Sequence, residues 1–176
     1  MKKLIISLLC FGGLLFGGVI NPQSSHAAAY SLKVFPKVLR HTWYHYDGHG
    51  RYDQITFGYK HYRMHNFYEK WNVYNGKIHY RNLKATRISH HPNWTFATPV
   101  YYHRMHWTNI YGWNQSAGDG DYYGVKVRRY HGHRVRVMSE AGGADIWTDS
   151  HYYATRKVAK VLGNKHFPGV LYYPKI

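Results

Sequence analysis

The chain has 176 residues, which suits one domain or two small ones, and its formal net charge is +16 with histidine counted as neutral. Its single cysteine, Cys10, lies in the N-terminal segment, so disulfides, thiolate catalysis and cysteine-ligated metals are excluded from the rest of the chain. Aromatic residues make up 18% of the sequence, with 19 tyrosines, a composition that favours half-buried strands and hydrated binding surfaces.

Residues 1–29 have the pattern of a secretory signal peptide. Lys2 and Lys3 provide a positive start, residues 4–20 form an apolar core, and residues 27–29 are alanines that suit cleavage before Tyr30. Removing Lys2 and Lys3 from the 24 basic residues leaves 22 against 8 acidic ones, so the mature charge would be +14. We therefore expect export; an uncleaved anchor of marginal length is the alternative.

The first strand is expected in residues 35–46, ending at a turn in residues 47–50. Thr42, Trp43 and Tyr44 favour a pleated surface, and the glycines of the turn allow the positive φ that a hairpin needs. Alternation places Trp43 and Tyr44 on opposite faces. We predict that Trp43 is a core residue that closes one end of a small β-barrel.

Further strands are expected along the middle of the chain. Residues 54–59 and 67–74 have strand composition, and Asn75-Gly76 predicts a hairpin turn into residues 77–80. Residues 83–88 alternate like a strand, whereas Pro92 marks a break. Residues 98–121 predict short strands and loops.

A second hairpin is expected from residues 122–130 and 133–138. Both strands alternate valine with a cation, which predicts an apolar inner face and a cationic outer face. The predicted core residues of the whole domain are Trp43, Val125, Val127, Val135 and Val137.

After this hairpin, Asp149 or Ser150 is expected to cap a helix that runs to Leu162 and ends at Gly163; a last strand beginning at Tyr152 is the alternative. Together the elements predict an all-β fold, either a single small antiparallel barrel or a strongly bent sheet of hairpins, with a short C-terminal helix. The predicted domain is residues 30–176, with an ordered core at about 35–165.

Two segments resemble a group of small secreted proteins of lactic acid bacteria. Residues 39–44 read Leu-Arg-His-Thr-Trp-Tyr where those proteins carry Arg-Gly-Thr-Trp-Tyr, and residues 145–153 with 157–160 match their tyrosine pair and basic segment. The resemblance spans most of the mature chain, roughly residues 35–160; it implies export and an uncharacterised function, and it brings no catalytic residues. The first-strand tryptophan is also similar to the Gly-x-Trp pattern of lipocalins. His41 replaces that glycine, so this likeness supports only the expectation of a barrel.

Histidine is abundant, with 15 residues, and some pairs share a strand face, such as His41 with His45 and His131 with His133. Neutral imidazole binds zinc, copper or nickel, but a closed site needs four convergent ligands. The sequence shows only spaced pairs and no His-Glu-x-x-His. Neither a dedicated metal site nor a cofactor is therefore predicted.

A secreted hydrolase that acts on the cell wall is the least favoured function class. A glycosidase needs two converging carboxylates, and Glu69 and Glu140 stand out only as the two glutamates of the chain. Turns or a helix cap are expected to take up four of the aspartates for backbone reasons: Asp47, Asp119, Asp121 and Asp149. We therefore expect a non-catalytic protein.

Cations lie beside aromatic rings in residues 59–63, 79–81, 101–104 and 128–130. That mixture suits phosphate contacts combined with stacking, either on single-stranded nucleic acid or on wall polymers that carry sugars and phosphates. Export favours the envelope, so we expect a secreted or cell-surface protein that binds an anionic cell-wall polymer or a membrane surface, with nucleic acid as a non-specific partner. The candidate binding residues are Lys60, Arg63, Arg81, Arg104, Lys126, Arg128, Arg129, Arg134 and Arg136.

Two further interpretations stay open at this point. The barrel interior could carry a small ligand, or the rings could be core and the cations a solvated exterior without a partner. The sequence does not indicate an oligomeric state.

Overall fold

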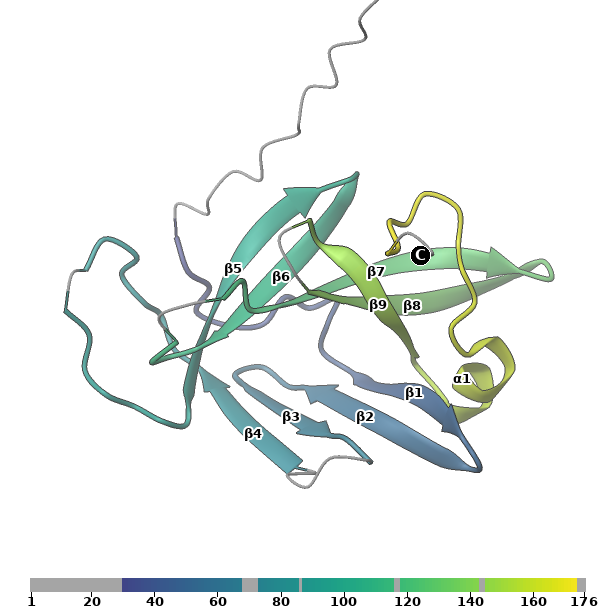
Figure 1. Ribbon diagram of the computed structural model, residues 1–176, viewed down its shortest axis with the longest axis horizontal. Coiled ribbons are helices and arrows are strands. Elements are labelled where there is room, and N and C mark those ends of the chain that lie inside the picture. Colours follow the sequence, from purple (N-terminus) through teal and green to yellow (C-terminus); the bar gives the residue numbers. More distant parts are fainter. Residues whose placement is uncertain (1–29, 68–72, 86, 116–117, 143–144, 174–176) are drawn as a thin grey trace, which may run out of the picture.

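The computed structural model describes residues 30–67, 73–85, 87–115, 118–142 and 145–173 (Figure 1). The predicted signal peptide, residues 1–29, lies outside the described residues. Within them the chain forms nine strands and one helix, in the order β1 (Thr42–Gly48), β2 (Arg51–Phe57), β3 (His61–His65), β4 (Val73–Ile78), β5 (Trp94–Tyr102), β6 (Met105–Gly112), β7 (Asp121–Tyr130), β8 (His133–Gly142), β9 (Trp147–Tyr153) and α1 (Arg156–Leu162).

The strands close into a barrel in sequence order, which confirms the predicted all-β class with its short C-terminal helix. Neighbours pair antiparallel except β4 and β5, which are parallel through Lys77↔Trp94 and Ile78↔Thr95. A parallel pair needs a long crossover instead of a tight turn, and residues 79–93 supply it. Figure 1 shows β1 to β4 along one side of the barrel and β5 to β9 along the other, with α1 beside β1 and β9.

The turn predicted at Asn75-Gly76 is wrong. Both residues lie inside β4, where Gly76 pairs with Tyr62 of β3. A Cβ on Gly76 would lie 2.5 Å from Cε1 of the Tyr62 ring. The glycine therefore makes room for a ring, which is a reason for glycine inside a strand that has nothing to do with turns.

Two other stretches differ from the prediction. Residues 83–85 and 87–88 belong to the crossover and not to a strand, and Leu83 and Ile88 are 38% and 40% exposed. An alternating sequence becomes a strand only where another strand pairs with it, and these residues form no strand among those that the structure describes. Residues 98–121, expected as short pieces, contain most of the long hairpin of β5 and β6, whose register runs from Thr95↔Gly112 to Tyr102↔Met105.

The C-terminal helix is shorter than predicted, because the alternative of a last strand holds for β9. Tyr152 and Tyr153 pack into two different buried clusters, as successive residues of a strand do. The helix begins only after Thr155, whose hydroxyl accepts a hydrogen bond from the amide of Val158 at 3.3 Å. It ends at Gly163 with φ of 50°, as predicted.

Trp43 is confirmed as a core residue. Its side chain is 0% exposed, and its indole N–H donates to the carbonyl of Leu39 at 2.8 Å. The guanidinium of Arg136 lies 4.9 Å from the ring centroid. Trp43 belongs to one cluster of buried side chains inside the barrel, with Phe35, Leu39, Ile55, Phe57, Tyr62, Ile78, Ala97, Ile110, Tyr123, Met138 and Tyr152.

The predicted inner face of the hairpin of β7 and β8 needs correction. The register pairs Val125 with Met138, whereas Val137 pairs with Lys126. Directly paired residues point to the same face, so the valines of β7 and those of β8 lie on opposite faces. Alternation within each strand was right, but a one-residue change of register inverts the faces, and the sequence does not reveal the register.

The four valines consequently have different environments. Val137 is buried, with 2% exposure, and is a core residue as predicted. Val125 and Val135 are partly buried against two different clusters. Val127 is 49% exposed and is not a core residue.

Candidate functional site

The predicted binding cations lie at the surface without acidic partners. None of the nine forms an ion pair with a carboxylate of the described residues; the ion pair that these residues do form joins His45 Nε2 and Asp47 Oδ1 at 3.6 Å. Four of the nine cations are partly buried: Arg81, Lys126, Arg128 and Arg136. The exposed ones are Lys60, Arg63, Arg104, Arg129 and Arg134.

Three of the partly buried arginines connect segments of the fold. Each guanidinium also lies over an aromatic ring, so replacing one would change stability as well as charge. Their N–H groups donate to backbone carbonyls far along the chain: Arg81 to Trp113 at 3.2 Å, Arg128 to Pro168 at 3.0 Å and Arg136 to Val38 at 2.7 Å.

Positive charges are crowded on the hairpin of β7 and β8. Arg129 and Arg134 pair directly across the two strands, an arrangement that is destabilising for like charges. Burial lowers the pKa of Lys126, and the charges of Arg128 and Arg104 lower it further. An anion that bound here would relieve this repulsion.

Acidic residues gather at a different place, inside the barrel. A cavity of about 320 Å³ lies between β1, β2 and β3 on one side and β7, β8 and β9 on the other. Four of the chain's eight acidic residues contribute to it. The cavity is lined by His45, Asp47, Asp53, Met64, His65, Asn66, Asp121, Glu140, Ser150 and Tyr152.

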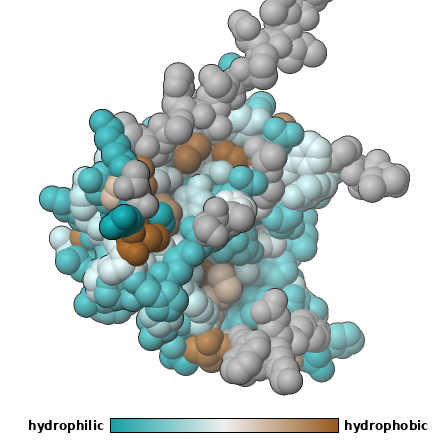
Figure 2. Space-filling model, turned by 60° about the vertical axis from the view of Figure 1, so that its left-hand side comes forward, coloured by the Kyte–Doolittle hydropathy of each residue, from teal (hydrophilic) through white to brown (hydrophobic). Residues whose placement is uncertain are grey.

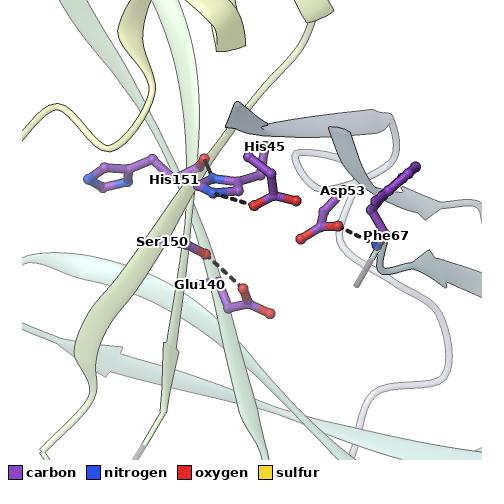
Figure 3. A network of polar contacts seen from close by, with 7 residues as sticks. His45, Asp53, Phe67, Glu140, Ser150 and His151 are labelled. Atoms are coloured by element: carbon purple, nitrogen blue, oxygen red, sulfur yellow. Dashed lines mark hydrogen bonds and ion pairs between the residues drawn. The ribbon is translucent and has the colours of Figure 1, made fainter. Parts of the chain in front are cut away.

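Glu140 and Asp53 point into the same space from opposite sides of this cavity (Figure 3). The Glu140 carboxylate accepts hydrogen bonds from the hydroxyls of Tyr123 at 3.0 Å and Ser150 at 2.8 Å. Burial nevertheless raises the pKa of Glu140. Asp53 accepts a hydrogen bond from the amide of Phe67 at 2.7 Å, and burial also raises its pKa.

Strand alternation explains why these acids face inward. Asp47 lies at a register shift of β1 but contacts His45, which is on the same face of β1 as Trp43, and the exposed Asp121 is on the same face of β7 as Tyr123. Trp43 and Tyr123 are buried inside the barrel, so the acids at the strand ends point toward the interior as well. The sequence predicts turns for Asp47 and Asp121 because aspartate is common in turns, so their position at the cavity could not be read from the sequence. Oδ2 of Asp47 is buried and has no hydrogen-bond partner among the described residues.

The cavity changes the candidate pair for a hydrolase. Glu69 lies outside the described residues, so its pairing with Glu140 stays a prediction. Glu140 faces aspartates instead, with Asp53 across the cavity.

Two histidines in or next to β1 bond to the backbone. His41 Nε2 lies 3.1 Å from the carbonyl oxygen of Ala154, and His45 Nδ1 lies 2.9 Å from that of His151. In the part of the chain that the structure describes, no three side chains of His, Cys, Asp or Glu are close enough together to hold a metal ion.

An aromatic cluster lies where β4 and β5 pair. Trp94 is stacked between His79 and His91, each with its ring centroid 3.6 Å from the indole, and Trp113 packs edge-on at 5.1 Å. Burial lowers the pKa of His79, and nearby positive charges lower it further, namely Lys77, His91, Lys60 and His61. Positive groups from several segments therefore converge at this end of the barrel.

Comparison of the chain with models of protein families, with curated proteins and with solved structures gives no match. In the described ranges, no helix combines the length and apolar character needed to span a bilayer. The face shown in Figure 2 is mostly hydrophilic, with hydrophobic residues in small separate patches. This face shows no large continuous apolar patch.

Proposed function

We propose that the protein is a secreted, non-catalytic binding protein that associates electrostatically with anionic polymers of the cell envelope. The observation that carries this proposal is the separation of charge. The candidate cations form no ion pairs with described carboxylates, whereas half of the acidic residues line an interior cavity. The outer positive charge is therefore not neutralised locally and attracts polyanions.

Exposed aromatic rings beside cations support a polymer that carries sugars or polyols as well as phosphates. The guanidinium of Arg40 lies 4.7 Å from the ring centroid of Tyr59, which is 61% exposed. Lys33 lies 5.8 Å from the ring centroid of Tyr80, which is 54% exposed. Such a pair offers an apolar surface to a sugar and a charge to a phosphate.

Retention on purified cell wall is expected to increase as the pH falls from 7 to 5 and to decrease as salt increases. An exposed imidazole titrates near pH 6.5, so acidification adds positive charge to the protein while phosphodiesters keep their negative charge. Screening limits attraction between exposed charges to about 10 Å at 0.1 M salt. The measurement is a pull-down at both pH values and two salt concentrations, on wall with and without its phosphate polymer.

Circular dichroism at pH 5 controls for unfolding in this experiment. Retention that stays constant across pH, salt and polymer removal would contradict the proposal, because each of the three changes acts on one side of the electrostatic attraction.

The cavity favours a second candidate function, that of a small-ligand carrier, and limits its ligand to a small organic cation. Four carboxylates make the interior negative, and one oxygen of Asp47 has no hydrogen-bond partner among the described residues. Calorimetry with a primary amine, a guanidinium and a quaternary ammonium compound is expected to detect binding that Glu140→Gln weakens about tenfold. Asp145→Asn, which removes an exposed carboxylate away from the cavity lining, is the matched control. No binding of any of the three cations would contradict the carrier.

A further inference from the structure

An open groove of about 630 Å³ lies over the outer face of β3 and β4. Its walls include Arg63 and His61 of β3, Asn75 and Lys77 of β4, and Asn93. Three of its lining residues, His61, Tyr62 and Arg63, belong to residues 59–63, a segment in which basic and aromatic residues lie side by side.

The strand register brings three of the positive groups onto one face. His61 pairs directly with Lys77, and Arg63 pairs with Asn75. His61, Arg63 and Lys77 are exposed, whereas Tyr62 between the first two is buried. Neighbouring strands are about 4.8 Å apart, and residues two apart on a strand are separated by about 6.8 Å. The three groups are therefore close enough to contact one or two phosphates of the same chain.

The positive charges at this end act on one another. Burial lowers the pKa of His79, and the nearby Lys77, His91, Lys60 and His61 lower it further. The groove cations Arg63 and Lys77 lie at the same end, so an anion bound there is attracted by several positive groups.

The groove also carries groups that suit the uncharged part of a polymer. Asn75 and Asn93 provide amides that can donate to and accept from hydroxyl groups. An inorganic anion would use only the cations, whereas a sugar or polyol phosphate uses both kinds of group.

We propose that the outer groove of β3 and β4 is a binding site for a phosphodiester-linked sugar or polyol chain, with Arg63, Lys77 and His61 on the phosphates and Asn75 and Asn93 on the units between them. This inference rests on the proposed function and specifies where on the surface the envelope polymer binds.

The test compares two double variants that each remove two positive charges. Arg63→Ser with Lys77→Ser removes the groove cations, and Lys157→Ser with Lys160→Ser removes an exposed pair on α1 that lies outside the groove. Binding to soluble wall phosphate polymer is measured by calorimetry at 0.15 M salt. The groove variant is expected to lose about tenfold or more in affinity, because a charge-assisted hydrogen bond to phosphate contributes on this scale. The control variant is expected to lose about threefold or less.

Equal losses in the two variants would overturn the assignment of the binding site to the groove. They would leave the proposed function in place, because binding would then depend on total charge alone. Wild type that does not bind the polymer would overturn both. Circular dichroism confirms that each variant is folded before binding is compared.

A third variant separates the polymer from a bare anion and remains informative if the double variant fails to fold. Asn75→Ala, which removes an exposed amide beside Arg63, is expected to weaken binding of the wall polymer about threefold and to leave binding of inorganic polyphosphate unchanged. Equal effects on both would overturn the assignment to sugar or polyol phosphates. Groove-dependent binding to phosphatidylglycerol vesicles without binding to the polymer would instead assign the site to a lipid surface and overturn the proposal.

Discussion

Replacing Trp43 with alanine is expected to lower the free energy of unfolding by about 3–5 kcal/mol. The side chain is 0% exposed, packs among the aromatic residues of the interior, and donates a hydrogen bond to the carbonyl of Leu39. Its removal leaves a large cavity and also takes the ring from beneath the guanidinium of Arg136. A loss of this size is a large share of the stability of an ordinary domain.

The measurement is a urea titration followed by far-ultraviolet circular dichroism, which avoids the fluorescence of the other tryptophans. Val127→Ala is the control, because Val127 is 49% exposed and its truncation is expected to change stability by only about 0.5 kcal/mol. A loss below about 1 kcal/mol for Trp43→Ala would show that the barrel does not depend on this residue.

Stability is expected to decrease between pH 6.5 and pH 4 through the buried imidazole of His151. This side chain is 1% exposed, with Nδ1 3.1 Å from the Ser139 hydroxyl and Nε2 2.7 Å from that of Tyr172. Burial, and then the charges of Arg128 and other cations, lower its pKa to about 4. The unfolded chain therefore binds this proton near pH 6.5, whereas the folded chain resists it until about pH 4. The stabilisation is complete above pH 6.5 and is lost as the pH falls through this window.

The size of the effect follows from the shift, which corresponds to about 3 kcal/mol between pH 7 and pH 4. Carboxylates of the cavity act in the opposite direction, because burial raises their pKa values and their neutral forms favour the folded state at low pH. Comparing wild type with His151→Gln cancels that contribution, so the variant is expected to lose about 3 kcal/mol less than wild type over this range. His131→Gln, in the exposed turn between β7 and β8, is the control. Equal pH dependence in wild type and His151→Gln would refute the assignment.

Local sequence patterns predicted the features that depend on local structure. Trp43 could be placed in the core because alternation and strand composition act within one strand. The end of the helix at Gly163 could be predicted because a positive φ at the cap is a property of that one residue. The long hairpin of β7 and β8 followed from two alternating runs and a glycine turn.

Features that depend on contacts between distant residues could not be predicted in this way. The sequence predicts Val127 in the core, but which face Val127 occupies depends on the register between β7 and β8, and neither strand's sequence determines that register. Gly76 appeared to mark a turn, although its role is to accommodate the ring of Tyr62. The acidic cavity combines Asp47 and Asp53 with Asp121 and Glu140, and no local pattern relates residues so far apart in the chain.

The barrel is closed at two seams that have few strand pairs. Among described residues, β4 and β5 share two register pairs and β1 and β9 share one, Tyr44↔Tyr153, whereas every hairpin has four or more. Side chains therefore join the two sides of the barrel: one buried cluster contains Trp43 and Phe57 as well as Tyr123 and Met138, and α1 packs beside β1 and β9. The acidic cavity lies between strands of both sides, so its shape depends on this packing.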